Sequence, residues 1–276
     1  MRLGGPVFEP FDSPEQWIAH LRKLGYRAAY CPVDASADAQ TIAAYAQAAQ
    51  EADIVISEVG VWNNPISTDD EARKAGIEKC QQQLALADEI GARCCVNIAG
   101  SRGAVWDGPD ADNFTPATFN LIVETVRGII DAVKPTRTFY TLEPMPWAYP
   151  DTPDSYLDLL RAINRPQFAV HLDPVNMISN PRLFYDNAAF LRDCFKKLGA
   201  YTKGCHAKDI VLASRLTVHL DEVRPGLGNL DYKVLLQEMN RLPKDIPLMI
   251  EHLPQEEYLP AANFIRDTAK SIGIEL

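Results

Sequence analysis

The chain contains 276 residues, of which 47% are hydrophobic and 23% are charged. This balance is ordinary for a globular protein and excludes extensive disorder. The formal net charge of -10 repels phosphate backbones and anionic lipid, and no apolar run is long enough to cross a membrane. The composition therefore argues against nucleic acids and membranes as partners and favours a small molecule.

The start of the chain and its cysteines give expectations about location. The opening sequence MRLGGPVFEPFDSPEQW lacks the charged segment and apolar stretch of a secretory signal. The six cysteines show no Cys-x-x-Cys spacing and mostly lie in apolar patterns, which favours buried reduced thiols over disulfides. We therefore expect a cytoplasmic protein. Homo-oligomer formation is left open by the sequence.

Short apolar runs alternate with segments of helical period along the whole chain. Runs of four to eight residues rich in Val, Ile, Cys and Tyr favour the strands of a parallel sheet. Eight strands are expected, at about residues 2–5, 28–33, 54–61, 94–99, 138–143, 168–173, 203–208 and 247–252.

Capping residues mark several of the helices between these strands. Ser13 is expected to cap the first helix, and Gly25 follows its last turn. Further helices are expected from about residue 69 to before Gly91, from Thr152, and from about residue 180 to before Gly199. The segment from about 209 to 230 mixes apolar stretches with a Gly/Pro turn and is predicted to be an extended active-site loop.

Alternating strands and helices could close into a barrel or form an open doubly wound sheet. No Gly-rich phosphate loop follows the first strand, so the usual signature of the nucleotide-binding open sheet is absent. Eight strand-helix units also need about 250 residues, close to the length of this chain. The prediction is an α/β fold, a (β/α)8 TIM barrel, with residues 1–276 forming a single domain.

Four of the expected strands end in a side chain that can bind a metal. In a barrel the ends of these successive strands are neighbours on one rim, so their side chains can converge. A cation would compensate the cost of burying the carboxylates there. Three carboxylates and one imidazole suit Mn²⁺ best, with Mg²⁺, Co²⁺ or Zn²⁺ as alternatives. The expected ligands of this single divalent metal ion are Glu143, Asp173, His206 and Glu251.

Other side chains near the strand ends are candidates for binding a substrate. Aromatic rims commonly stack on sugars, and polar groups can hold a hydroxyl, carboxylate or phosphate, although each residue could instead be a packing anchor or a solvated charge. The candidates are Glu58, Trp62, Asn97, Trp147, Asn176, Lys208, Asp209, Arg215 and Arg224. Because successive side chains of a strand point to opposite faces, we expect His171 and His252 to point away from the site. The sequence does not decide whether His219 belongs to the site.

The strand-end motifs LEP, LDP and HAKD, with the later PGLGNLDY, resemble the xylose isomerase-like TIM-barrel superfamily. That superfamily includes sugar phosphate isomerases and epimerases, ketose 3-epimerases and inosose-processing enzymes, and the resemblance spans nearly the whole chain. It implies a divalent metal on the four strand-end residues. Two departures leave the substrate open: Asn176 stands where many ketose 3-epimerases have a His, and Trp147 and Tyr149 occupy the region where a second Glu is expected.

The expected chemistry is a metal-dependent sugar isomerase or epimerase that acts through an enediolate on a ketose or related polyol-ketone. Glu143 and Glu251 are the expected catalytic residues, one removing a proton and the other returning it. The alternative on the same fold is a metal-dependent dehydratase of an inosose or hydroxy acid, with His219 or Lys208 as proton donor. An apurinic endonuclease-like barrel needs more histidines and a cationic groove, and a non-catalytic binding module leaves the converging acids unexplained.

Overall fold

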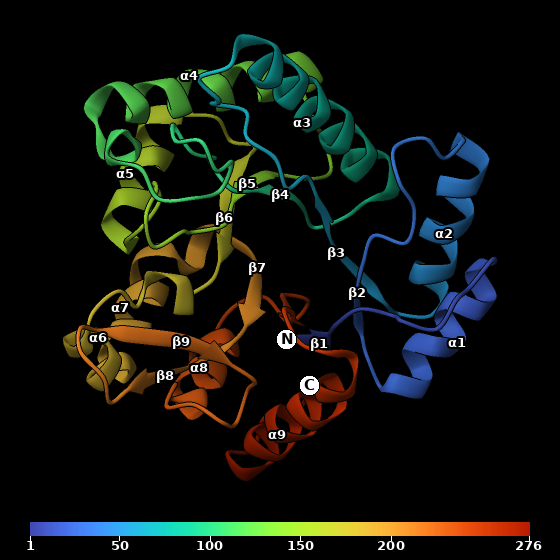
Figure 1. Ribbon diagram of the computed structural model, residues 1–276. Helices are drawn as coiled ribbons and strands as arrows, with labels where there is room; N and C mark the ends of the chain where they lie inside the picture. The colour runs from blue at the N-terminus through green and yellow to red at the C-terminus, as the bar shows by residue number, and fades with distance from the viewer.

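Eight parallel strands close into a barrel in the computed structural model, which describes residues 1–276. Around the barrel the strand order is β1, β10, β7, β6, β5, β4, β3 and β2, and Figure 1 shows the succession from β2 to β7. The predicted (β/α)8 fold class is confirmed, and every expected strand is present, each ending one to three residues earlier than expected. The strands are β1 (Arg2–Gly4), β2 (Ala28–Tyr30), β3 (Val55–Gly60), β4 (Cys94–Asn97), β5 (Tyr140–Leu142), β6 (Phe168–Leu172), β7 (Thr202–Ala207) and β10 (Pro247–Ile250).

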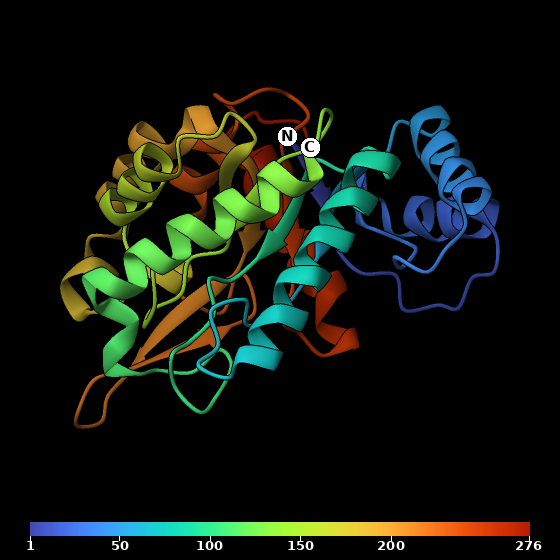
Figure 2. The same cartoon turned by 90° about the horizontal axis from the view of Figure 1, so that it is seen from above.

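Helices surround the barrel, and several begin and end where the capping residues predict. The Ser13 side chain accepts the Gln16 N–H at 3.3 Å, and Gly25 ends the helix with a φ of 66°. In Figure 2 the long helices α3 and α4, which pack against each other, flank one side. The helices are α1 (Pro14–Leu24), α2 (Ala39–Glu51), α3 (Asp70–Ile90), α4 (Pro116–Val133), α5 (Pro153–Ile163), α6 (Pro181–Tyr185), α7 (Asn187–Leu198), α8 (Tyr232–Met239) and α9 (Tyr258–Ser271), with 3-10 turns at Ala111–Phe114, Val175–Met177, Gly199–Tyr201 and Gln255–Glu257. No helix combines the length and apolar character that a bilayer crossing requires.

The single helix expected from about residue 180 to Gly199 is in fact two helices, α6 and α7. The Asn187 amide donates to the Phe184 carbonyl at 2.7 Å and to the Asn229 carbonyl at 3.0 Å. The Asn187 side chain therefore occupies the Phe184 carbonyl, which a backbone N–H would bond if the helix continued. The same side chain links the break between α6 and α7 to the segment before α8.

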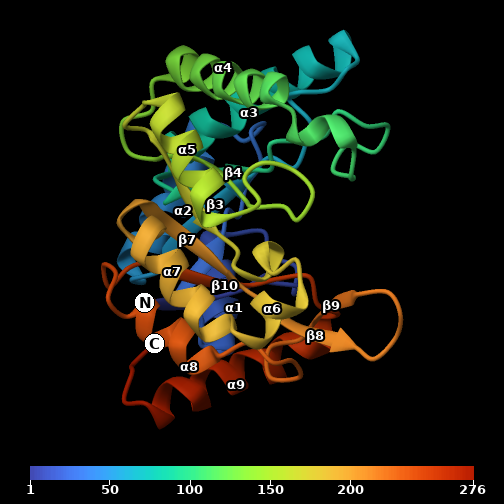
Figure 3. The same ribbon diagram turned by 90° about the vertical axis from the view of Figure 1, so that its left-hand side faces the viewer.

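The segment from 209 to 230, predicted to be an irregular loop, instead begins with an antiparallel hairpin. Strand β8 (Asp209–Ala213) pairs with β9 (His219–Val223) over five residue pairs. Ile210 is buried, and Leu212 and Leu220 pack against the core, so this hairpin has an apolar face that the expected loop lacks. Figure 3 shows the hairpin projecting from the end of the barrel opposite the two chain termini.

A buried tyrosine connects two of the strands that lead into the candidate site. The Tyr156 hydroxyl, carried by α5, lies 2.6 Å from the Leu142 carbonyl and 3.1 Å from the Ala169 carbonyl. It also accepts the Leu142 N–H at 3.2 Å. This one hydroxyl therefore bonds to both β5 and β6, immediately below Glu143 and Asp173.

Replacing Tyr156 with Phe is expected to lower the free energy of unfolding by about 1–3 kcal/mol, because buried polar groups lose their partner. Urea denaturation of the wild type and of Tyr156→Phe measures the difference. Tyr185→Phe is the matched control, since Tyr185 is 77% exposed. Equal stability of the Tyr156 variant and the wild type would show that this hydroxyl does not stabilise the barrel.

Candidate metal centre

The four strand-end residues expected to bind a metal lie together in the structure. Glu143 follows β5, Asp173 follows β6, His206 lies in β7 and Glu251 follows β10. These four strands are consecutive around the barrel. One ligand atom from each residue lies within 4.8 Å of the others, and all four side chains are buried.

The His206 ring nitrogen Nδ1 is the centre of this group. It lies 2.8 Å from Glu251 Oε1, 3.2 Å from Glu143 Oε1 and 3.8 Å from Asp173 Oδ2. Because these three oxygens face one nitrogen, the donors form a compact set of three carboxylates and one imidazole.

Lys208 supplies positive charge at the edge of this group. Its ammonium lies 2.8 Å from Glu251 Oε1 and 2.9 Å from Asp173 Oδ2. Asn176 completes the surroundings by donating its amide to Glu143 Oε1 at 3.0 Å. Each of the three acids therefore has a polar neighbour, yet three carboxylates face only one permanent cation.

Burial and ion pairing shift these acids in opposite directions. Burial raises the pKa of Glu143 above its ordinary value. Burial also acts to raise the pKa of Glu251, but the charge and hydrogen bond of His206 together with the charge of Lys208 outweigh it and lower that pKa to about 2. For Asp173, Lys208 and His206 together outweigh burial, and the pKa lies below its ordinary value.

His206 experiences the reverse of these shifts. Burial opposes its protonation, but Glu251 and Glu143 raise the pKa of His206 well above its ordinary value. A proton on this imidazole and a cation at Nδ1 are alternatives, because a metal ligand must be the neutral ring.

The donor set fits a divalent ion on two counts. With His206 neutral, three carboxylates and the Lys208 ammonium leave two negative charges, which one divalent ion balances. Asp173 Oδ2 and Glu251 Oε1 are also buried without a hydrogen bond, and the single Lys208 ammonium is the only permanent cation beside both. A divalent ion would supply further positive charge to these oxygens, which are hard ligands of the kind that such ions prefer.

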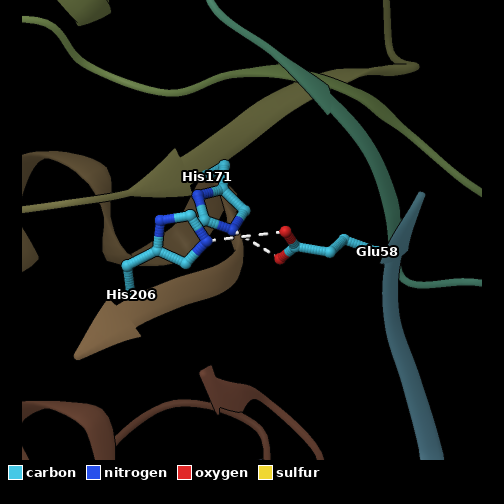
Figure 4. Close-up of side chains that lie close together, drawn as sticks. All are labelled: Glu58, His171 and His206. Carbon is cyan, nitrogen blue, oxygen red and sulfur yellow. Dashed lines mark hydrogen bonds and ion pairs between the residues drawn. The ribbon is translucent and has the colours of Figure 1, made fainter. Parts of the chain in front are cut away.

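A second polar cluster lies inside the barrel next to this centre, as Figure 4 shows. His171 Nε2 lies 2.9 Å from Glu58 Oε2, and His206 Nε2 lies 3.5 Å from Glu58 Oε1. The two imidazole rings meet edge to face, with centroids 4.1 Å apart. The Glu58 carboxylate therefore faces Nε2 of the His206 ring, whereas the three carboxylates of the candidate metal site face Nδ1 of the same ring.

The expectation that His171 points away from the site is wrong. Residues two apart on a strand share a face, so His171 points to the same side as Asp173. Gly204 makes room for it, since a Cβ on Gly204 would lie 3.2 Å from the His171 ring. The imidazole therefore occupies the barrel interior.

A cavity of about 570 Å³ opens above the four strand ends. Glu143 and Glu251 line it, and so do four of the nine substrate-binding candidates. These are Trp62, Trp147, Asn176 and Lys208. The remaining five do not line this cavity.

Three of those five residues are buried and hold the structure around the site. Glu58 lies in the barrel interior as described. The Asn97 amide donates to Asn63 Oδ1 at 2.9 Å. Asp209 accepts the backbone N–H groups of Gly226, Gly228 and Leu230, so it anchors the turn after β9.

Arg215 and Arg224 lie outside the cavity. Arg215 is exposed at the turn between β8 and β9. Arg224 pairs with Glu257 at 2.5 Å. His219, which begins β9, does not line the cavity either.

Sequence reasoning missed several residues that line the cavity. Trp106 and Asp107 come from the irregular segment after β4, and Glu222 comes from β9. Glu222 Oε2 lies 3.6 Å from the Lys208 ammonium. A signal existed for Trp106, because a tryptophan in a loop after a strand end is a rim candidate like Trp62.

His252 also lines the cavity, so the expectation that it points away is wrong. Its φ of 56° places it in the left-handed region. Strand alternation after Glu251 therefore no longer applies, and His252 Nδ1 lies 3.4 Å from Glu222 Oε2.

The sequence of residues 18–268 matches the family model of the xylose isomerase-like TIM barrel. The chain therefore belongs to this family, as the strand-end motifs predict. No curated protein matches it in sequence.

Solved structures with the same barrel extend over nearly the full length of the chain. The probable 3-DHS dehydratase of Bacillus anthracis is 17% identical, with a TM-score of 0.70 and 100% of both chains covered. D-psicose 3-epimerase of Clostridium cellulolyticum H10, solved with D-tagatose, is 14% identical, with a TM-score of 0.69 and 100% of both chains covered. A xylose isomerase-like protein of Mycobacterium smegmatis in complex with magnesium is 15% identical, with a TM-score of 0.69 and 98% and 95% covered. At these identities the similarity shows the fold alone.

Removal of the central imidazole tests the metal centre. Titration with Mn²⁺ in a calorimeter is expected to show about one ion bound per chain for the wild type and none for His206→Ala. Binding should weaken as the pH falls, because protons compete for Nδ1. His20→Ala on α1 is the matched control. Unchanged Mn²⁺ binding by His206→Ala would remove this residue from the ligand set.

Glu58→Gln is expected to weaken Mn²⁺ binding by about 10–100-fold, because groups that orient a metal-binding imidazole contribute this much. The same titration measures it, and urea denaturation checks that the variant is folded. Glu71→Gln, an exposed glutamate of α3, is the control. Wild-type affinity in a folded Glu58→Gln would show that Glu58 has no influence on Nδ1.

Proposed function

We propose that the chain is a divalent-metal-dependent sugar isomerase or epimerase that acts on a ketose or related polyol-ketone through an enediolate. The observation that carries this proposal is the placement of two glutamates, Glu143 and Glu251, on opposite flanks of Asp173 and His206. Both glutamates also line the cavity. Inversion of a carbinol centre through an enediolate needs two such groups, one on each face of the substrate.

The ion would be held by Glu143, Asp173, His206 and Glu251, and Mn²⁺ is our first choice, with Mg²⁺, Co²⁺ and Zn²⁺ as alternatives. When bound, a divalent ion polarises a carbonyl oxygen and acidifies the adjacent C–H. The structural neighbour solved with magnesium supports the use of such an ion on this fold.

The proton transfers would fall to the outer oxygens of the two glutamates. Oε1 of Glu143 and Oε1 of Glu251 both face His206 Nδ1, which leaves Oε2 of each for a substrate proton. One glutamate removes a proton and the other, in its protonated form, delivers a different proton to the opposite face, which inverts a carbinol centre. Shuttling by a single glutamate between adjacent carbons would instead interconvert an aldose and a ketose.

Two further side chains of the cavity would position the substrate. Lys208 and Asn176 lie within 3.4 Å of each other, and both line the cavity beside the carboxylates. An ammonium and an amide can hold hydroxyl and carbonyl oxygens. We therefore assign them to orienting the substrate.

A dehydratase of an inosose or hydroxy acid is the second candidate. Its first step is the same proton removal, but a donor must then protonate the departing hydroxyl. Lys208 lines the cavity and could serve as this donor, whereas His219 does not line it. The neighbour described as a probable 3-DHS dehydratase has this fold as well.

Incubation of the Mn²⁺-loaded protein with ketoses and inososes in D₂O distinguishes the two reactions. An isomerase or epimerase is expected to give products with solvent deuterium at the carbinol carbon and no loss of water, as read by mass spectrometry and NMR. An unsaturated or deoxy product would favour the dehydratase. Metal binding without exchange on any of these compounds would contradict both.

Glu143→Gln and Glu251→Gln are each expected to lower kcat by at least about 10²–10⁴-fold, because each removes a general acid or base. Deuterium exchange and turnover on the substrate identified above measure the effect, with Mn²⁺ content checked for each variant. Glu256→Gln, an exposed glutamate near β10, is the control. Near-normal turnover with metal bound would exclude the altered residue from proton transfer.

A further inference from the structure

The tryptophans of this chain are unevenly distributed. Of the four, only Trp17 is buried, at 2% exposure. The other three, Trp62, Trp106 and Trp147, are 41%, 42% and 37% exposed, and all three line the cavity above the strand ends. Exposed apolar groups that gather in one cavity mark a ligand-binding surface.

These three tryptophans form one wall of the cavity, which we call the aromatic wall. Trp62 follows β3, Trp106 lies after β4 and Trp147 follows β5, and these strands are neighbours in the barrel. The charged residues Lys208 and Glu251 come from β7 and β10, on the other side of the barrel. The aromatic wall therefore lies across the cavity from Lys208 and Glu251, and Glu143, which follows β5 like Trp147, lies between the two.

Contacts hold two side chains of the aromatic wall, Trp147 and Trp62, in place. The Trp147 indole N–H donates to the Asp107 carbonyl at 2.6 Å, and the Trp147 carbonyl accepts the Asn113 amide at 3.0 Å. Trp62 packs on Gly60 so closely that a Cβ there would lie 2.2 Å from the indole nitrogen. Because the Trp147 N–H already has a partner, the part of this side chain left for a ligand is its apolar ring surface. A preformed surface also binds with a smaller loss of conformational entropy.

The cavity is larger than the reacting part of a sugar requires. Its volume of about 570 Å³ lies within the range of roughly 300–1,000 Å³ that encloses drug-sized ligands. A single monosaccharide held at Glu143 and Glu251 fills only part of this volume. The aromatic wall would then remain in contact with water, at a cost to its apolar surface.

We propose that the aromatic wall binds a second pyranose ring, so that the substrate is a glycoside whose ketone-bearing unit reaches Glu143 and Glu251. The C–H face of a pyranose is apolar and suits the flat faces of Trp106 and Trp147. Its hydroxyls need acceptors, and the Asp107 carboxylate in the same wall provides them. This inference rests on the proposed function for the reacting end of the substrate.

Keto-disaccharides test the proposal, because each is D-fructose that carries a second ring. Calorimetry of the Mn²⁺-loaded protein would compare D-fructose with lactulose, maltulose, isomaltulose and turanose, which differ in linkage and second sugar. At least one disaccharide is expected to bind about tenfold more tightly than D-fructose. Trp106→Ala is expected to remove this advantage and to leave D-fructose binding unchanged.

Two further variants make the result specific. Asp107→Asn keeps the shape of the side chain, and it is expected to weaken disaccharide binding without affecting D-fructose. Tyr201→Ala removes an aromatic side chain that is 45% exposed and does not line the cavity, and it should change neither affinity. Disaccharides that bind no better than D-fructose, or an advantage that survives in Trp106→Ala, would overturn the proposal.

The outcome is separable from that of the proposed function. Deuterium exchange on ketoses without preference for a second ring would retain the enediolate chemistry and exclude the second-ring site. Disaccharide binding that depends on Trp106, with no exchange on any compound, would retain the site and exclude the isomerase or epimerase.

Discussion

Each carboxylate that enters the interior of a barrel loses its hydration, at a cost of several kcal/mol unless positive charge or hydrogen bonds replace the water. Three such groups, Glu143, Asp173 and Glu251, lie at one end of this barrel. Lys208 and the His206 imidazole are the nearest compensation. The need to balance this charge links the fold to cation binding, because only closure of the barrel brings the ends of β5, β6, β7 and β10 together.

The same requirement organises the residues below the carboxylates. Glu58 and His171 occupy the interior beside His206, where an isolated charge would be costly. Burial acts to raise the pKa of Glu58, but the two imidazoles outweigh it and lower that pKa below its ordinary value. In the neutral ring that metal binding requires, a negatively charged Glu58 favours the proton on the facing nitrogen of His206. That tautomer leaves Nδ1 free for a cation on the side of the three acids.

The mouth of the barrel is shaped by segments that surround this charged centre. The hairpin of β8 and β9 brings Glu222 to the cavity, and Asp209 at its base anchors the turn that leads into α8. On the opposite side, the loops after β3, β4 and β5 supply the aromatic wall. Glu222 and the aromatic wall therefore lie on different sides of one opening, with Glu143 of the charged centre next to the loop that carries Trp147.

The amino-acid sequence by itself determined the eight strands, the capped starts of α1, α3 and α5, and the four strand-end residues, because these features depend on local patterns. Polar residues such as Asp173 at the end of an apolar run are visible in the sequence, and parallel strands share one end. Only the tertiary structure decided that Trp106 and Glu222 reach the cavity, that Asn97 and Asp209 do not, and that the φ of His252 turns it inward. Those outcomes depend on contacts between loops that are far apart in the sequence. The local spacing of hydrophobic and polar residues carries no information about such contacts.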